Sequence, residues 1–269
     1  MAEPAFDRGA FSARLATRRL GRHLLVRAEV ESTNDVAWEA LAAGAPDGTT
    51  VVADRQTRGR GRAGRRWHTA PGRGLALSVV MFPGCERGRL GALPLAAGLA
   101  LARALERLGA AAELRWPNDL TLGGRKVAGI LCESRRDTAG GDVVVIGTGL
   151  NVAQRAEDFP AELAAGATSL ALEDVVATRE AAAAEFLNAL EPLWDEMEEG
   201  GRERVLEAWK ARAGFWGRPV AVRTAGGEVT GIARDLDPEG ALLLALPEGG
   251  ELRVLAGDLV ETGPARVER

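Results

Sequence analysis

The chain has 269 residues, 46% of them hydrophobic, and a formal net charge of −4 at pH 7, which is typical of an ordinary globular protein. It contains no apolar run of about 18 residues and no signal-peptide pattern at its N-terminus, so we expect a cytoplasmic protein without a membrane span. Two cysteines without CxxC spacing and only two histidines argue against a disulfide framework, a zinc site and a serine-hydrolase triad.

Residues 23–45 predict a strand, a turn and a helix. Ser32 and Thr33 are good N-cap residues, and the apolar side chains that follow recur at three- and four-residue steps. Gly44 is the expected end of this helix. Capping of the helix is therefore one role open to either hydroxyl.

The sequence up to residue 214 predicts further strands interleaved with helices. Strands are expected at 49–54, 74–82, 111–122, 126–134 and 142–152, the last two joined by a hairpin at 135–141, and helices at 94–109, 179–199 and 202–214. Pro192 should kink the helix at 179–199 or end it early, because proline lacks the N–H that a helix interior uses.

The pattern changes beyond Trp216, where four or five short strands are separated by the turns AGGE, DPEG and PEGG. Short strands with tight turns are typical of a small antiparallel barrel. We therefore place a domain boundary near residue 215 and expect a large domain at 1–215 and a small one at 216–269.

A loop at 55–67, RQTRGRGRAGRRW, contains six arginines and three glycines but no acid. Residues 59–64 fit the G-x-G-x-x-G pattern of dinucleotide folds, but the RRWHTAPGRG that follows cannot form the helix such a fold requires. A Walker-type phosphate loop fails because Arg65 and Arg66 stand where Lys and Ser or Thr are needed.

Two classes of ligand stay open for this loop on its residues alone. Arginine clusters bind nucleic-acid backbones, although a pI of about 5.5 and the absence of tyrosine argue against such a surface. The loop also suits a small anion, because glycines let the backbone fold over a phosphate and arginines bind it bidentately. Repulsion among the arginines should keep the empty loop mobile, and Trp67 either stacks on a purine or anchors the loop.

Four stretches in order around this loop favour the small anion: ESTND at 31–35, RWPNDL at 115–120, KVAGILCE at 126–133 and GTGLNV at 147–152. Together they resemble the signature of the biotin protein ligases over about residues 24–260. The resemblance implies an α+β catalytic domain, with a mixed sheet backed by helices, followed by an SH3-like barrel. It also implies that the protein uses ATP and Mg²⁺ to make biotinyl-5′-AMP and then transfers biotin to a lysine of a carrier domain.

The resemblance implies a set of residues for binding biotin. Ser32, Thr33 and Asn34 are expected at the mouth of the biotin pocket. Gln56 is expected to meet the ureido group, whose N–H groups and carbonyl an amide side chain complements. Gly129 is expected to let the biotin ring approach the strand backbone, where a Cβ would intrude.

The same resemblance assigns the arginine loop to the charged parts of the reaction. Arg60, Gly61 and Arg62 are expected to wrap the biotin carboxylate and then the acyl phosphate. Arg65 is a candidate for the leaving pyrophosphate, and Trp67 for packing on the adenine. Closure of the loop would keep water from a reactive anhydride.

Lys126 is the expected catalytic centre, with Arg62 and Asp119 as further catalytic candidates. An ammonium beside the biotin carboxylate and the α-phosphate reduces their repulsion and stabilises charge in the transition state. Asn118 is an expected nucleotide contact, and Asp119 is expected to hold Mg²⁺ or to accept a hydrogen bond from the acceptor lysine. Asn151 is expected to contact the triphosphate or its Mg²⁺.

The sequence departs from the family pattern at Arg58, where a small residue is common, and at Arg115, where lysine is commoner. Both departures keep positive charge. Only thirty residues precede Glu31, which leaves no room for the DNA-binding domain of repressor-type members. We therefore expect a monofunctional ligase that binds no DNA.

The expected partner is the biotin carboxyl carrier protein domain of acetyl-CoA carboxylase or a related carboxylase. A monomer and a homodimer both stay open. The alternative functions are a lipoate or octanoate ligase of the same fold and, from a different class, a nucleic-acid-binding module that uses the arginine loop.

Overall fold

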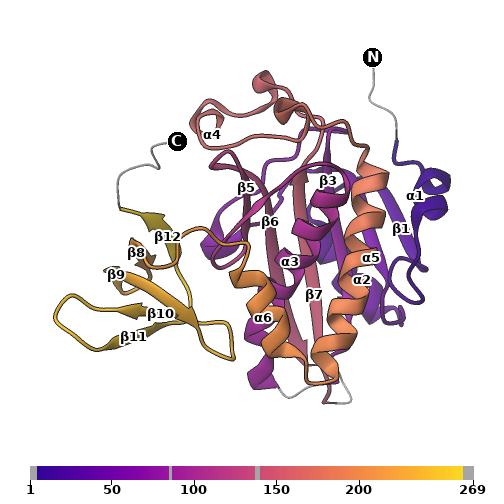
Figure 1. The fold of residues 1–269 in the computed structure, drawn as a ribbon. Coiled ribbons are helices and arrows are strands. Elements are labelled where there is room, and N and C mark those ends of the chain that lie inside the picture. The colour runs from indigo at the N-terminus through magenta and orange to yellow at the C-terminus, as the bar shows by residue number, and fades with distance from the viewer. Residues whose placement is uncertain (1–4, 85–86, 137–139, 263–269) are drawn as a thin grey trace.

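The computed structural model describes residues 5–84, 87–136 and 140–262, and its larger part is a seven-stranded mixed sheet (Figure 1). The strands lie in the order β1-β2-β3-β7-β6-β5-β4. Strands β1 and β2 pair in parallel, and the other neighbours pair antiparallel. Their bounds are β1 Leu24–Val30, β2 Thr50–Gln56, β3 Gly74–Met81, β4 Glu113–Arg115, β5 Asp119–Leu122, β6 Arg125–Arg136 and β7 Asp142–Asn151.

Helices cover both faces of this sheet, which confirms the expected α+β fold. Helices α3 and α5 pack together over one face, and α2 packs on β2, β3 and β7 (Figure 1). The helices are α1 Arg8–Arg14, α2 Thr33–Ala42, α3 Leu93–Arg107, α4 Ala161–Ala164, α5 Arg179–Glu198 and α6 Arg202–Lys210.

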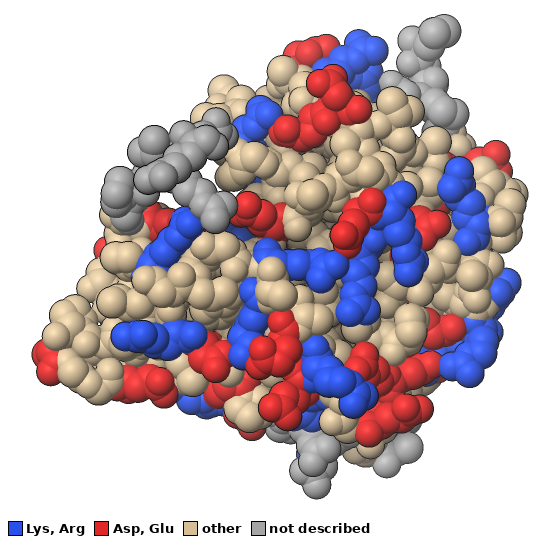
Figure 2. Space-filling model, viewed as in Figure 1, with Lys and Arg blue, Asp and Glu red and all other residues tan. Residues whose placement is uncertain are grey.

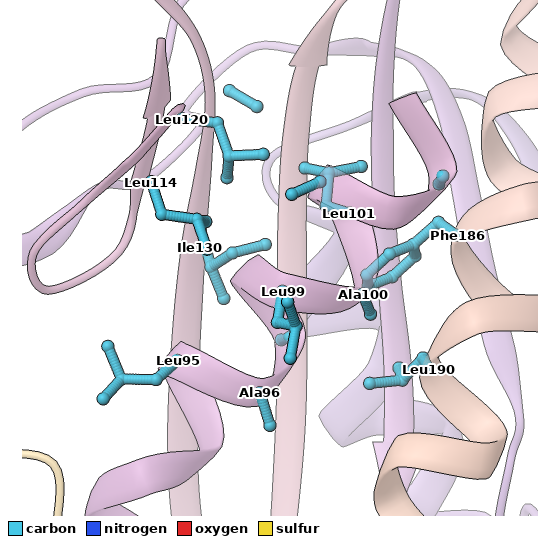
Figure 3. Close-up of a cluster of buried hydrophobic side chains, with 14 of the residues drawn as sticks. Leu95, Ala96, Leu99, Ala100, Leu101, Leu114, Leu120, Ile130, Phe186 and Leu190 are labelled. Carbon is cyan, nitrogen blue, oxygen red and sulfur yellow. The ribbon is translucent and has the colours of Figure 1, made fainter. Parts of the chain in front are cut away.

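The main core lies between the sheet and helices α3 and α5. Figure 3 shows its side chains coming from these two helices and from β4, β5 and β6. Because alternate residues of a strand point to opposite faces, Leu75, Leu77 and Leu150 join this core, whereas Val80 joins a smaller cluster beneath Trp38 of α2.

Helix α5 runs without interruption to Glu198, so the prediction that Pro192 would end it early is wrong (Figure 1). Pro192 is exposed, whereas Leu190, Leu193 and Trp194 beside it are buried in the core. The missing N–H and the proline ring cost a helix about 3 kcal/mol. Burial of several large apolar side chains, each contributing about 1.5–3 kcal/mol, outweighs this cost.

Residues 111–122 form two short antiparallel strands, β4 and β5, instead of the single run expected. The run breaks at Pro117, which cannot donate to a strand ladder. The Trp116–Pro117 peptide is cis. Trp116 is buried and its Nε1 donates to the carbonyl oxygen of Gly240, 3.0 Å away, so this turn ties the main sheet to the C-terminal strands.

The C-terminal strands form a five-stranded antiparallel sheet beside α6, as expected for an SH3-like barrel (Figure 1). Their order is β11-β10-β9-β8-β12, with bounds β8 Pro219–Thr224, β9 Gly227–Leu236, β10 Leu242–Ala245, β11 Glu251–Val254 and β12 Asp258–Glu261.

An aromatic and ionic junction connects α6 to this sheet. The rings of Phe215 and Trp216 pack against Trp209, with centroids 6.3 and 6.2 Å away. Lys210 Nζ lies 2.5 Å from Glu207 and 2.7 Å from Asp235 of β9. Burial opposes the charge of Lys210, but hydrogen bonds to these two carboxylates outweigh it and raise the pKa of the lysine.

Strands β6 and β7 pair as far as Arg136 and Asp142, and residues 137–139 of the predicted hairpin lie outside the described part of the chain. Cys85 lies outside it as well. Within the described residues, every helix is too short or too polar to cross a lipid bilayer.

Candidate active site

A cavity of about 350 Å³ opens beside α2 and the arginine loop, between the main sheet and the segment that follows β7. All the residues that the sequence predicts for the site line this one cavity. They are Ser32, Thr33, Asn34, Gln56, Arg60, Gly61, Arg62, Arg65, Trp67, Asn118, Asp119, Lys126, Gly129 and Asn151. Four motifs that are far apart in sequence therefore converge in space.

One end of the cavity is polar, buried and uncharged. The backbone N–H and the hydroxyl of Thr33 donate to Gln56 Oε1, at 2.8 and 3.1 Å. Ser78 Oγ, on β3, lies 2.7 Å from Thr33 Oγ1 and 2.6 Å from Asn34 Oδ1. The Nδ2 group of Asn34 is buried without a partner among the described residues, which costs about 1–3 kcal/mol, so this end suits a ligand that offers a hydrogen-bond acceptor.

Neither hydroxyl at the start of α2 caps the helix. Ser32 occupies the N-cap position, but its side chain makes no capping hydrogen bond. Thr33 uses its hydroxyl on Gln56 and Ser78. Capping of α2, the structural role that the sequence left open for Ser32 and Thr33, is therefore not performed by either side chain.

The arginine loop folds into a short hairpin, residues 59–67, which we call the arginine hairpin. Gly61 N donates to Arg65 O at 2.7 Å and Trp67 N donates to Gly59 O at 2.9 Å. At the tip, Ala63 has a φ of 52° and Gly64 a φ of 74°, a left-handed turn that the sequence analysis did not foresee. The left-handed conformation costs a residue with a Cβ about 1–2 kcal/mol.

Acidic side chains from other elements offset the charge of this loop. Arg60 lies 2.5 Å from Asp35 and 2.9 Å from Glu133, and Arg65 lies 2.7 Å from Asp258 of β12. Two outer pairs are Arg55 with Glu29 at 2.8 Å and Arg58 with Glu31 at 3.1 Å. These ion pairs compensate the repulsion among the arginines, which was the reason for expecting a mobile loop.

Arg62 differs from Arg60 and Arg65, which pair with carboxylates, because its own side-chain hydrogen bonds go to neutral oxygens. Its Nη1 donates to Asn118 Oδ1 at 3.2 Å and to the carbonyl oxygen of Gly257 at 3.3 Å. Burial lowers the pKa of Arg62, and the nearby Arg65 adds to this against the opposing charges of Asp258 and Asp119. A partly desolvated guanidinium of this kind gains from binding an anion.

Lys126 lies at the meeting point of the polar and the cationic ends. Its Nζ is 2.7 Å from Asp119 Oδ1 and 5.9 Å from the centre of the Trp67 ring. A Cβ at Gly129 would lie 3.5 Å from Lys126 Nζ and 3.4 Å from Asp119 Oδ1, so this glycine leaves room beside the ion pair.

Two glycines of β7 form part of the cavity wall and were missed as individual site residues. A Cβ at Gly149 would lie 2.3 Å from the Trp67 ring, and one at Gly147 would lie 2.4 Å from Asn34 Oδ1. Both positions therefore exclude any larger residue unless Trp67 or Asn34 moves. The alternation of glycines in GTGLNV was the available signal, since glycine in a strand marks close approach by another group.

The segment after β7 also lines the cavity and was not predicted. Phe159, Leu163 and Gly166 all contribute to the lining. Lys126 N donates to Gly166 O at 2.8 Å and Thr168 N donates to Lys126 O at 2.9 Å. The backbone of Lys126 thus holds this segment over the cavity.

Asn151 and Asn118 are both engaged in hydrogen bonds within the protein. Asn151 donates to Thr168 O at 2.8 Å and accepts from Gln154 Nε2 at 3.0 Å. Asn118 donates to Ile130 O at 2.7 Å. Within the described residues, no three His, Cys, Asp or Glu side chains form a group that could hold a metal ion. The donors present thus do not fit a metal held by the protein alone.

Basic and acidic residues are interspersed over the face shown in Figure 2, which gives no continuous basic surface there for a nucleic acid.

Comparisons with known proteins agree with this geometry. The model of the Biotin/lipoate A/B protein ligase family matches residues 26–151, and that of the Biotin protein ligase C terminal domain matches residues 215–260. The biotin–[acetyl-CoA-carboxylase] ligase of Paracoccus denitrificans is 37% identical over 84% of this chain and 95% of its own length. The corresponding ligase of Mycobacterium tuberculosis is 37% identical over 89% of both chains.

A solved structure supports the same relation. The biotin protein ligase from Aquifex aeolicus in complex with biotin and ATP aligns with a TM-score of 0.73, at 28% identity, over 89% of this chain and 98% of that one. The ordered motifs, the shared cavity and the extent of these matches lead to one conclusion: the chain belongs to the biotin protein ligase family.

Proposed function

We propose that this chain is an ATP-dependent ligase that activates biotin as biotinyl-5′-AMP and transfers it to a lysine of a biotin carboxyl carrier protein domain. The observation that supports this best is that one cavity joins a buried, uncharged polar end to a cationic end. Biotin has the matching ends, a neutral ureido ring and a carboxylate. The phosphates of ATP would meet the same cationic end.

The ureido ring would lie at the polar end. Its carbonyl would accept a hydrogen bond from Asn34 Nδ2, to which no described residue offers an acceptor, and its N–H groups would donate to oxygens of Thr33 or Gln56. Ser32 would line the mouth of this pocket, and the absence of a Cβ at Gly129 would let the ring approach β6.

In the first step, a biotin carboxylate oxygen attacks the α-phosphorus of ATP. A P–O bond forms to the carboxylate, the P–O bond to the β-phosphate breaks, and pyrophosphate leaves with the electron pair. Lys126 and Arg62 would reduce the repulsion between the two anions and stabilise the charge that develops. Arg65 would exchange Asp258 for the leaving pyrophosphate.

In the second step, the amine of the acceptor lysine attacks the carbonyl carbon of the mixed anhydride. A C–N bond forms, the C–O bond to the phosphate breaks, AMP leaves, and the nitrogen loses a proton. Asp119 is the carboxylate beside Lys126 and would accept a hydrogen bond from the incoming amine.

We also place the domain boundary near residue 215.

The arginine hairpin and the segment at 159–167 would enclose the nucleotide. Trp67 lies against the backbone at Gly149 and offers its ring to the cavity for packing on adenine. Arg60 and Gly61 would form the part of the hairpin that covers the acyl phosphate. Excluding water would protect the anhydride from hydrolysis.

We infer that Mg²⁺ enters bound to ATP as part of the substrate. Mg²⁺ usually keeps several waters and is held by phosphates with one or two carboxylates. Asp119 is the carboxylate nearest to Lys126, whereas the oxygen of Asn151 already accepts from Gln154.

The test is biotin-dependent exchange of labelled pyrophosphate into ATP by the purified chain with Mg²⁺. We expect exchange with biotin and little with lipoate or octanoate. Exchange with lipoate or octanoate instead would favour the related ligase. No exchange with any acid, together with salt-dependent oligonucleotide binding, would favour a nucleic-acid-binding function. Labelling of a lysine in a purified carrier domain would then test the second step.

A further inference from the structure

Two acidic residues, each the last of its motif, have no role in the proposed chemistry. Asp35 is the last residue of ESTND and Glu133 the last of KVAGILCE. Both turn toward Arg60 of the arginine hairpin, from α2 and from β6. Three motifs therefore meet at one guanidinium, away from Lys126.

The contacts of this guanidinium are directional and multiple. Arg60 Nη1 donates to Asp35 Oδ1 at 2.5 Å, and Nη2 donates to both oxygens of Glu133 at 2.9 and 3.1 Å. Trp38 Nε1, one turn along α2 from Asp35, donates to Glu133 Oε2 at 2.9 Å. The Arg135 guanidinium lies 4.3 Å from the centre of the Trp38 ring. We call Asp35, Trp38 and Glu133 the Arg60 clasp.

This arrangement leaves Arg60 poorly suited to bind a substrate anion, because two carboxylates already balance its charge. Burial opposes that charge, but the bonds and charges of Asp35 and Glu133 outweigh it and raise the pKa of Arg60. Arg62, two residues along, makes its hydrogen bonds to neutral oxygens. The two arginines of the GRGR sequence thus have different surroundings.

The clasp also holds the hairpin to both walls of the cavity. Helix α2 supplies Asn34 at the polar end, and β6 supplies Gly129 beside Lys126. Arg60 pairs with Arg66 across the hairpin, so fixing Arg60 fixes the ribbon that presents Arg62. An exposed pair on the same loop, Arg58 and Glu31, joins its side chains by one hydrogen bond of 3.1 Å, and neither residue lines the cavity.

We propose that Asp35 and Glu133 are positioning residues that hold the arginine hairpin over the bound adenylate through Arg60, and that Arg60 acts by this attachment instead of by binding substrate. The inference rests on the proposed ligase function. Its chemical basis is the fork of the guanidinium, which matches two carboxylates in a way that a lysine ammonium cannot. Loss of the clasp would let the hairpin open and release the reactive intermediate.

The experiment measures how fast biotinyl-5′-adenylate leaves the full-length enzyme. Labelled adenylate is formed in place from biotin and MgATP, chased with unlabelled adenylate, and the dissociation rate is expressed per active site titrated by the burst of pyrophosphate. Glu133→Gln and Asp35→Asn should each release adenylate about five- to tenfold faster, as expected when a charged hydrogen bond is replaced by a weaker, neutral one. Arg60→Lys should do the same, since it keeps the charge but loses the fork.

Glu31→Gln is the matched control, because it removes the carboxylate that pairs with an exposed arginine of the same loop. This variant should release adenylate at a rate within twofold of that of the unmodified enzyme. A purely structural role of Glu133 would lower the melting temperature and the active fraction but leave release per active site unchanged. Release within twofold of normal in both Glu133→Gln and Arg60→Lys would overturn the inference. Should Glu133→Gln fail to fold, Asp35→Asn and Arg60→Lys decide the question by the same criterion.

The failure of this inference and that of the proposed function are distinguishable. If the unmodified enzyme shows no biotin-dependent pyrophosphate exchange, the ligase function fails and the inference falls with it. If exchange is normal but release is unaffected in the variants, only the positioning role is wrong.

Discussion

The two faces of the main sheet are made by the same strands but differ in almost every physical property. Toward α3 and α5, β3 and β7 present large side chains such as Leu77 and Leu150 in a continuous apolar core. Toward the cavity the same strands present Ser78, Gly147 and Gly149. One face removes apolar surface from water, and the other keeps space open.

This difference separates stability from activity. The face beneath α3 and α5 gains free energy from buried area, about 25 cal/mol per Å² of apolar surface. The cavity face contributes less area, through the smaller cluster beneath Trp38, and keeps a buried donor, Asn34 Nδ2, for which the described residues supply no partner. Substitutions that remove a cavity side chain should therefore change the reaction with little effect on unfolding, and those that remove a side chain from the other face should do the reverse.

The largest expected effect on activity is that of Lys126→Ala. Adenylate formation should fall about 10²- to 10³-fold, because a cation that acts mainly in the transition state is lost. Biotin binding, measured by calorimetry, should fall far less. The matched control is Lys210→Ala, which removes the other lysine of the chain and should leave pyrophosphate exchange intact. Abolished biotin binding with an unchanged transfer rate from preformed adenylate would contradict the role we assign to Lys126.

Arg62→Ala should slow both steps by roughly 10- to 100-fold, the effect expected for losing a hydrogen bond between charged groups. It should also let biotinyl-5′-adenylate leak, which is measured by trapping the released compound. Arg66→Ala on the same hairpin is the control, since Arg66 is exposed and its side chain donates to Thr57 O. Undiminished retention in Arg62→Ala would count against the covering role of the hairpin.

Gly149→Ala tests whether the open space itself matters. The new Cβ would lie 2.3 Å from the Trp67 ring, so the ring must shift. The apparent KM for ATP should rise about tenfold, because the displaced ring packs less well on the nucleotide. The crowding should also lower the unfolding free energy by about 1–3 kcal/mol. Gly226→Ala, whose nearest neighbour would be 3.7 Å away, should change neither quantity. An unaltered KM for ATP in Gly149→Ala would argue against nucleotide packing on Trp67.

Glu191→Gln should have the smallest effect on activity and a clear effect on stability. Its carboxylate, on α5, accepts from the backbone N–H groups of Arg18, Arg19 and Leu20 at 2.6 to 3.0 Å. Burial alone would raise the pKa of Glu191, but these bonds outweigh it and the pKa is lowered. The substitution should cost about 1–3 kcal/mol at pH 7 with kcat unchanged.

The pH dependence of this effect has a definite sign. A lowered pKa in the folded state stabilises the protein above the unfolded pKa, about 4.3 for glutamate, and the contribution is lost as the pH falls through the folded value. The unfolding free energy of Glu191→Gln should therefore change less between pH 4.5 and lower pH than that of the unmodified chain. Glu185→Gln on the same helix serves as control. Parallel pH curves for Glu191→Gln and the unmodified chain would show that the three backbone contacts contribute nothing.

The sequence was a good guide wherever one residue pattern dominates. Short apolar runs located β3 and β7, and the helical spacing after Pro94 located α3. The prediction failed at Pro192. The sequence shows the local cost of a proline in a helix, but it does not show that Leu193 and Trp194 beside this proline are buried.

The candidate site shows the same limit. The motifs placed every predicted residue on one cavity, but Gly257 and Asp258 contact the arginine hairpin from nearly 200 positions further along the chain. Pairings between separate domains leave no periodic signal in sequence. Ser78 was read only as part of an apolar strand, and its contact with Asn34 became visible once the sheet was assembled.

The ion pairs of Lys210 have a consequence for chemical self-damage. An enzyme that stores an acyl phosphate carries an electrophile able to acylate any free amine, yet this chain has only two lysines among its 34 basic residues. Lys126 is paired with Asp119, and Lys210 is held as an ammonium between two carboxylates, a form that lacks the lone pair needed for attack. Arginine supplies the remaining positive charge without a nucleophile, because guanidinium does not lose its proton in proteins. The hairpin can thus surround its own reactive product with cations that the product cannot modify.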